Sequence, residues 1–223
     1  EIHSAIDSPA DGLILLTGGL NAFAKRRRKR ATGFCEASGC RSLDMSVRAY
    51  FSDRDIETVS EALDIAEDRT GEYYKFSFGQ WKRHRYGVKT LASLRREEIA
   101  PEPAFALLNK YTRAQAEDSL SVREHPVDFY SICLQDHRIL KALGRDRNVG
   151  LLPLMVYVFT HELIHIVRFC NFSQRFEVKG EGRRREEEIV HGTTLNVLRG
   201  LALQDLGYIM EAYRSHGICE LMA

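Results

Sequence analysis

The stretch Leu151–Cys170 reads LLPLMVYVFTHELIHIVRFC, and the interpretation of the whole chain starts from it. Apolar residues fill almost every position around its polar centre, so the stretch predicts a helix that is buried nearly all round. Inside it His161, Glu162 and His165 form the pattern H-E-x-x-H. On a helix the two histidines share one face, where two imidazoles can bind one metal ion. An unpaired buried polar group costs roughly a few kcal/mol of folding free energy, and a bound zinc ion would compensate this cost for the two histidines and the glutamate.

The charge composition of the chain excludes a global attraction to nucleic acid. The 223 residues contain 32 Lys+Arg against 31 Asp+Glu, so the two signs nearly cancel. A hydrophobic content of 44% is enough to bury a core, and the length predicts one domain or one domain with a small appendage. We therefore expect a folded protein that does not take nucleic acid as its partner.

Cysteine usage and apolar runs favour a cytoplasmic protein with no membrane span. Five cysteines, an odd number in a chain this long, do not suggest a secreted disulfide framework. The apolar run Gly12–Leu16 is far shorter than the roughly 20 residues that span a bilayer, and no signal-peptide pattern precedes it. The run Leu151–Phe159 is also too short. Because the sequence begins at Glu1 without a methionine, we expect a processed or trimmed chain, and a targeting segment upstream stays open.

Residues 1–45 predict an N-terminal extension to a main domain over residues 46–223. Lys25–Arg30 reads KRRRKR, and six consecutive cations repel one another, so a solvated face or linker is favoured over a phosphate-binding or localisation segment. Cys35 and Cys40 flank a glycine-containing turn in FCEASGC. We expect free thiols there; half a zinc site, or a thiol that caps a catalytic metal in a latent form, are the alternatives.

Hydrophobic periodicity elsewhere predicts a mainly helical α+β domain with a small antiparallel sheet. Aromatic residues between Glu72 and Lys89 favour a hairpin around Gly79. An extended substrate can bind along a sheet edge, and this hairpin or a strand over Asp128–Cys133 is expected to supply that edge. In chain order we expect helix Asp55–Asp68, strands Tyr73–Phe78 and Tyr86–Val88, helices Ala92–Glu98 and Pro103–Glu117, strand Asp128–Cys133, a helix over 136–143, helix Leu151–Cys170 and a long helix from about residue 183 through Leu206.

A catalytic zinc site needs three protein ligands and an open position for water, so a third ligand is expected after the H-E-x-x-H helix. Residues 183–191 read RRREEEIVH and enter the last predicted helix. Glu187 lies on a helical stripe that turns toward the core and includes Leu198. The stripe of Glu188 includes Arg199 and is expected to be partly exposed to solvent. Glu187 is therefore the first choice. The alternates are Glu186, Glu188 and His191.

This arrangement resembles the gluzincin branch of zinc metallopeptidases, the thermolysin-like class whose motif is HExxH plus a distal glutamate. The resemblance rests on HELIH at residues 161–165 and on Glu187, 22 residues after His165, and covers about residues 150–205. The family often carries E-x-x-x-D at the distal glutamate, where the aspartate orients a zinc-binding histidine. Here His191 stands at that position, so an imidazole replaces the carboxylate. The resemblance implies a zincin-like metallohydrolase fold with an H-E-x-x-H active-site helix.

The resemblance also implies an activity and a role for each site residue. His161, His165 and Glu187 would bind Zn²⁺, and Glu162 would be the general base for a zinc-activated water in a metallopeptidase acting on peptide or protein substrates. Such sites use a Tyr or His donor for the oxyanion of the tetrahedral intermediate. Arg168 is expected to form a salt bridge with the EEE run rather than to bind substrate. The candidates for the oxyanion donor are Tyr208, Tyr213, His191, His216 and His137.

Three other interpretations use the same residues. Residues 162–165 and 188–191 both read E-x-x-H, the motif that ferritin-like di-iron proteins place on two helices. That design needs two further glutamates, one of them on a helix between the motifs, and residues 168–187 are too few and too polar for such a helix. It also leaves His161 without a role. The second interpretation is a chance H-E-x-x-H with hydrogen-bonded core histidines, and the third is a catalytically silent zincin fold that acts as a binding or regulatory module.

Overall fold

The structure is a computed structural model that describes residues 49–100, 104–112, 128–173, 175–177 and 179–220, without the side chains of residue 213 and residues 215–220. The predicted N-terminal extension, with its basic run and cysteine pair, lies outside the described residues. The described part is mainly helical with a small sheet, which confirms the α+β class. Its elements are α1 (Asp53–Tyr74), α2 (Phe78–Trp81), β1 (Tyr86–Lys89), the 3-10 turns η1 (Leu91–Ser93) and η2 (Arg96–Glu98), β2 (Ala106–Thr112), β3 (Asp128–Leu134), α3 (Asp136–Arg145), α4 (Leu151–Cys170), α5 (Glu181–Leu198) and α6 (Leu206–Glu220).

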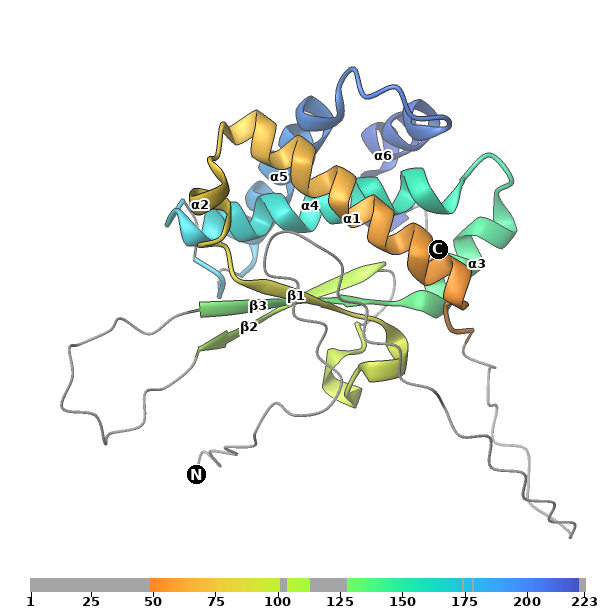
Figure 1. Ribbon diagram of the computed structural model, residues 1–223, viewed down its shortest axis with the longest axis horizontal. Helices are drawn as coiled ribbons and strands as arrows, with labels where there is room; N and C mark the ends of the chain where they lie inside the picture. The colour runs from red at the N-terminus through yellow and green to blue at the C-terminus, as the bar shows by residue number, and fades with distance from the viewer. Residues whose placement is uncertain (1–48, 101–103, 113–127, 174, 178, 221–223) are drawn as a thin grey trace, which may run out of the picture.

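Helix α4 forms the centre of the core. It contacts α1, α5, α6 and β2, and Figure 1 shows these helices on one side of the sheet. The side chains of Met155, Phe159 and Ile166 are completely buried, as the continuous apolar sequence predicts. The length and apolar composition of α4 would allow it to cross a membrane, but 78% of its apolar 18-residue stretch is buried inside the protein. This burial agrees with the predicted absence of a membrane span.

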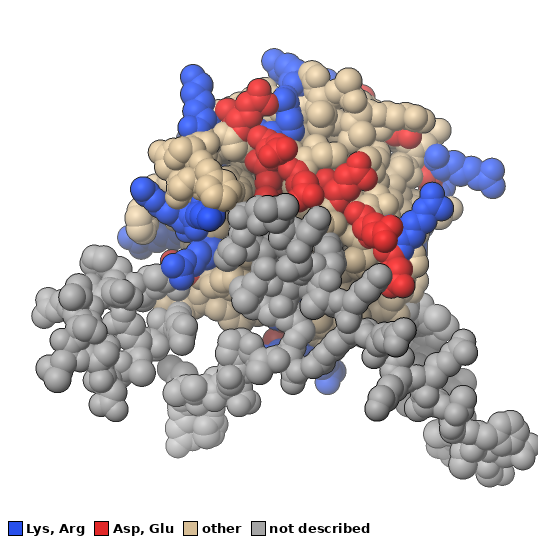
Figure 2. Space-filling view, viewed as in Figure 1, with Lys and Arg blue, Asp and Glu red and all other residues tan. Residues whose placement is uncertain are grey.

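Helix α1 covers one side of α4 and extends beyond the predicted range of Asp55–Asp68. The Ser52 side chain caps its first turn by accepting a hydrogen bond from Asp55 N, and the Ser52 backbone N–H donates to the Asp55 carboxylate. Val59, Leu63 and Ala66 lie on its buried face. Its outer face carries a row of exposed carboxylates, visible as the red band in Figure 2. These residues are Glu57, Glu61, Asp64, Asp68 and Glu72.

The sheet is mixed rather than antiparallel. Strand β3 lies between β1 and β2; β2 pairs with it antiparallel, whereas β1 pairs with it parallel, with Tyr86 opposite Tyr130. The chain reaches β3 from β1 through the 3-10 turns and β2, and such a long connection is what a parallel pair requires. Because β3 is paired on both sides, Asp128–Cys133 does not supply the free edge that we predicted as one alternative. The outer strands are β1 and β2.

One strand assignment and two helix assignments between α1 and β3 are wrong. The predicted strand Tyr73–Phe78 is helical at its start, because α1 continues to Tyr74 and ends where Lys75 adopts a left-handed conformation (φ 55°). No hairpin therefore forms around Gly79, which lies in the short helix α2. Two of the predicted helices are also wrong: Ala92–Glu98 forms only short 3-10 turns, and the described part of Pro103–Glu117 forms strand β2.

The predicted long helix after residue 183 is two helices. Helix α5 ends at Leu198, where Arg199 leaves the helical conformation and Gly200 has a φ of 82°. A glycine in the left-handed region is a common helix terminator because it carries no Cβ. Leu206 then begins α6, which packs against α4. The break leaves α5 as a separate helix that lies along α4.

Glu98→Gln is expected to lower the free energy of unfolding by about 2 kcal/mol at pH 7, because the buried Glu98 carboxylate accepts hydrogen bonds from Lys89 and Tyr111. Burial alone would raise the pKa of Glu98, but hydrogen bonds from the Arg95 backbone, Lys89 and Tyr111 lower it below 4.5. The stabilisation is therefore present above about pH 4.5 and is lost as the pH falls through the folded-state pKa. Urea unfolding at pH 7 and below pH 4.5 measures this, with exposed Glu97→Gln as the control; an equal difference between wild type and Glu98→Gln at both pH values would contradict it.

Candidate metal centre

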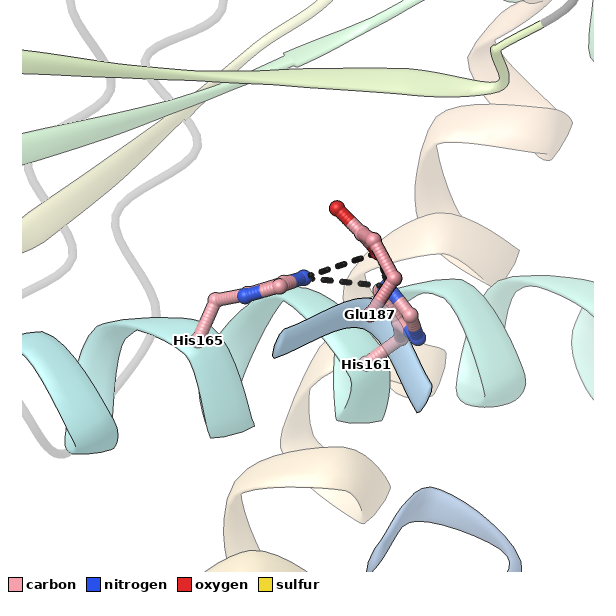
Figure 3. Close-up of side chains that lie close together, drawn as sticks. All are labelled: His161, His165 and Glu187. Atoms are coloured by element: carbon pink, nitrogen blue, oxygen red, sulfur yellow. Dashed lines mark hydrogen bonds and ion pairs between the residues drawn. The ribbon is translucent and has the colours of Figure 1, made fainter. Parts of the chain in front are cut away.

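The candidate metal centre lies between helices α4 and α5. His161 and His165, one turn apart on α4, and Glu187 on α5 present their side chains to one point (Figure 3). The Nε2 atoms of the two histidines are 3.2 Å apart. Glu187 Oε2 lies 3.3 Å from His161 Nε2 and 3.4 Å from His165 Nε2. Within the described residues, this is the one group of three His, Cys, Asp or Glu side chains whose donor atoms converge in this way.

The triangle of donor atoms has the dimensions of a zinc site. A regular tetrahedron with edges of 3.2–3.4 Å has its centre about 2.0 Å from each corner, which is the usual distance from zinc to a histidine nitrogen or a carboxylate oxygen. Two imidazoles and one carboxylate are also a donor set that catalytic zinc sites use. Three protein ligands leave the fourth corner open. The Glu187 side chain is 44% exposed, so the group of donors is not fully enclosed by the protein.

The Glu187 carboxyl group is held in its charged form beside the two histidines. Burial alone would raise the pKa of Glu187, but hydrogen bonds from the His161 and His165 rings lower it far below its usual range, so the group is a carboxylate at neutral pH. Nδ1 of each histidine is buried and has no hydrogen-bond partner among the residues that the structure describes. The His165 ring is held instead by stacking on Phe169, at a centroid distance of 5.7 Å. The Nε2 atoms of both histidines and Oε2 of Glu187 thus converge on the same point.

Glu162 sits beside the triangle without forming part of it. Glu162 is half-buried. Burial raises the pKa of Glu162 to about 7; the Glu187 carboxylate contributes in the same direction, whereas the charges of His161 and Arg183 oppose it. A carboxyl group with a pKa near the working pH can both accept and return a proton. Glu162 is thus a carboxyl group with a pKa near neutral pH that feels the charges of His161 and Glu187.

The three consecutive glutamates of α5 have three different surroundings. Glu186 is buried and forms two hydrogen bonds with the Arg168 guanidinium, at 2.6 and 2.8 Å, which confirms the predicted salt bridge. Glu187 faces the two histidines, whereas Glu188 is exposed. The helical stripe predicted for Glu187 is only partly as expected. Glu186 occupies the centre of the buried stripe, and Glu187 lies at its flank.

His191 is paired with a residue that the sequence did not suggest. Its Nδ1 atom lies 2.7 Å from the hydroxyl oxygen of Tyr157, one turn before His161 on α4. Burial lowers the pKa of His191, and the charges of His161 and Arg214 lower it further. His191 is therefore neither among the three converging donors nor hydrogen-bonded to a metal-site histidine nitrogen. Together with the Arg168–Glu186 pair it fastens α5 to α4 on both sides of Glu187.

Tyr157→Phe is expected to lower the free energy of unfolding by about 1 kcal/mol, or the Tm by roughly 2–4 °C, because one buried hydrogen bond is lost. Zinc content should stay unchanged, since the variant leaves the three converging donors in place. Thermal unfolding and elemental analysis measure the two quantities. Tyr208→Phe, which removes an exposed hydrogen bond to Asp146, is the control. A loss of zinc in Tyr157→Phe would assign His191 a role in metal binding.

One of the other proposed oxyanion donors, Tyr208, is hydrogen-bonded to a residue outside the three converging groups. Tyr208 is exposed and donates its hydroxyl to Asp146 Oδ2 at 2.6 Å. His137 lies on α3, which precedes α4 in the chain, and the side chains of Tyr213 and His216 are outside the described part. Glu188 and His191, which the di-iron interpretation needs, do not join Glu162 and His165 in a converging group among the described residues.

Sequence reasoning missed two residues of the site. Tyr157 precedes His161 by four residues, and Arg183 precedes Glu187 by four, so both lie one helical turn from a donor on the same side of their helix. That spacing is the signal that could have identified them. Comparison of the chain with protein-family models, with curated proteins and with solved structures finds no match in any of the three.

Proposed function

We propose that the protein is a zinc-dependent metallopeptidase with a zincin-like, gluzincin-type site. The observation that carries the proposal is the triangle of His161 Nε2, His165 Nε2 and Glu187 Oε2, with Glu162 beside it. Its substrates are peptides or proteins. The cytoplasm is the proposed location, in keeping with the free thiols of Cys133 and Cys170.

The three donors hold the metal and Glu162 moves the proton. Bound zinc would supply a water whose pKa is lowered toward about 7 and a Lewis acid for the scissile carbonyl. Glu162, with a pKa of about 7, accepts the proton of the attacking water and then returns it to the leaving amine. Arg168–Glu186 and Tyr157–His191 keep α5, and with it Glu187, in register with α4.

The donor geometry favours one zinc over the alternatives. A di-iron centre would leave His161 unused, yet its Nε2 atom is one corner of the observed triangle. Two core histidines that had met by chance would not need a carboxylate oxygen within reach of both rings, whereas Glu187 Oε2 lies 3.3 Å from His161 Nε2 and 3.4 Å from His165 Nε2. A silent binding module would have no need of a carboxyl group with a pKa of about 7 next to the donors.

Elemental analysis of the purified protein, together with hydrolysis of a broad peptide library, tests the proposal. We expect one zinc per chain, hydrolysis that stops when the zinc is removed by a chelator, and recovery when zinc is restored. Two irons per chain would favour the di-iron alternative, and a protein without metal would contradict both. Zinc without any turnover would favour the binding or regulatory module.

A further inference from the structure

Arg183 occupies an unusual position at the start of α5. It belongs to the helical stripe of Val190, Thr194 and Val197, which is buried against the rest of the fold, but in the first turn of the helix Arg183 itself is exposed. It precedes Glu187 by one turn on the same side of α5. Its charge also acts on Glu162. The Arg183 guanidinium thus lies on the side of α5 that faces α4, next to the donor triangle, and it is in contact with water.

Arg183 has no ion pair or hydrogen bond within the part of the chain that the structure describes. Its neighbours on the acidic run are engaged elsewhere, since Glu186 is bound by Arg168 and Glu187 by the two histidines. No ion pair joins Arg183 to Glu162 either. A guanidinium carries five N–H donors, and an exposed Arg183 that uses none of them within the described residues keeps them available to a ligand.

The surroundings of Arg183 add positive charge to the same end of the molecule. Residues 175–185 carry five cations against two carboxylates, and residues 75–85 carry four cations and no carboxylate. The two segments adjoin Tyr130, whose backbone N–H donates to Arg85 O and whose ring lies 6.3 Å from that of Phe176. Figure 2 shows basic side chains at the end of the molecule where α2 lies, apart from the acidic band over α1. An anionic ligand is attracted to this end.

The geometry points to Arg183 as the residue that binds a carboxylate of the substrate close to the scissile bond. This inference rests on the proposed peptidase function and names its substrate class, peptides with an acidic group near the cleavage site. A guanidinium presents a planar fork that matches a carboxylate with two parallel hydrogen bonds. The carboxylate can be the C-terminus of a short peptide or the side chain of an Asp or Glu residue, and the two sources have the same chemistry.

Peptide binding to the zinc-loaded Glu162→Gln protein tests the inference without requiring turnover. The probes are short, fluorescently labelled random peptides in four pools: a free C-terminal acid, the C-terminal amide, and each of these with Asp and Glu replaced by Asn and Gln. Fluorescence anisotropy gives the Kd of each pool. We expect about tenfold or more tighter binding of pools that carry the relevant carboxylate. The acid and amide pools identify a C-terminal carboxylate, and the Asn and Gln pools identify a side chain.

The matched variants are Arg183→Ala, Arg183→Lys and, as the control, Arg184→Ala on the exposed neighbouring position. Arg183→Ala should abolish the preference, Arg183→Lys should keep part of it, and Arg184→Ala should keep nearly all. A preference that survives in Arg183→Ala, or no preference at all, would overturn the inference. So would a single-stranded oligonucleotide that competes with the peptides, since it would assign the basic end to nucleic acid. If the carboxylate preference appears but the wild-type protein cleaves no peptide, the proposed peptidase activity fails and Arg183 remains a ligand-binding residue.

Discussion

Glu162→Gln is expected to lower kcat for peptide hydrolysis by about 10²–10⁴-fold while the protein keeps one zinc per chain. Glutamine has nearly the shape of glutamate but cannot accept a proton from water. The variant leaves His161, His165 and Glu187 untouched, so metal binding and fold should survive. Because the unfavourable burial of a charge at this position is also removed, the Tm should not fall. Single-turnover hydrolysis and elemental analysis on the same preparation measure the rate and the metal.

Glu181→Gln is the control for this prediction, because Glu181 is an exposed carboxylate in the first turn of α5. Its kcat should equal that of the wild-type protein. Full activity in Glu162→Gln would show that another group handles the proton, and the proposed mechanism would then be wrong. A loss of zinc in Glu162→Gln would instead place Glu162 among the ligands.

Glu187→Gln is expected to weaken zinc binding by at least about 100-fold. Even the loss of a group that only hydrogen-bonds to a metal ligand typically lowers metal affinity by about 10–100-fold. The carboxylate is the charged corner of the donor triangle, and a neutral amide oxygen is a poorer zinc ligand. After dialysis the variant should hold almost no zinc, and hydrolysis should fall with the metal content. The rise in Tm that zinc gives the wild-type protein should disappear as well, because a ligand stabilises only the state that binds it.

The neighbouring glutamates provide matched controls for this prediction. Glu188→Gln changes an exposed side chain and should keep both zinc and activity. Glu186→Gln should keep the metal but lower the Tm, because it leaves the Arg168 guanidinium without its charged partner. If Glu188→Gln lost zinc and Glu187→Gln did not, the third ligand would be misassigned.

Helices with a single long apolar stripe were predictable from the sequence, and short segments were not. The apolar spacing of α1 identified a helix, although not its last turn, which Lys75 closes. The segment Ala106–Thr112 has apolar residues that fit a helix or a strand equally well. Its pairing with β3 decides the outcome, with Leu108 on the core side and Tyr111 on the opposite face beside Glu98. That pairing joins residues that are far apart in the chain, and the hydrophobic periodicity of one segment gives no information about it.

The candidate site was predictable to the same degree. The i, i+4 spacing of His161 and His165 places both rings on one face whatever the rest of the fold does. Helical phase alone did not separate Glu186 from Glu187, because Glu186 occupies the centre of the buried stripe of α5 and Glu187 lies next to it at the flank. Arg168 decides between them by binding Glu186. The hydrogen bond between Tyr157 and His191 depends on how α4 and α5 are aligned with each other, and the sequence of one helix alone does not determine that alignment.

The burial of α4 on all sides also bears on how the chain folds. In the unfolded chain this helix is a 20-residue apolar segment that would aggregate or adhere to membranes if it stayed uncovered. Helix α1 precedes it in the chain and can cover one side as soon as α4 leaves the ribosome, whereas α5 and α6 follow it. Synthesis of the last two helices therefore completes the cover. Chains truncated before Glu181 should accumulate in the insoluble fraction even though they contain the whole H-E-x-x-H motif.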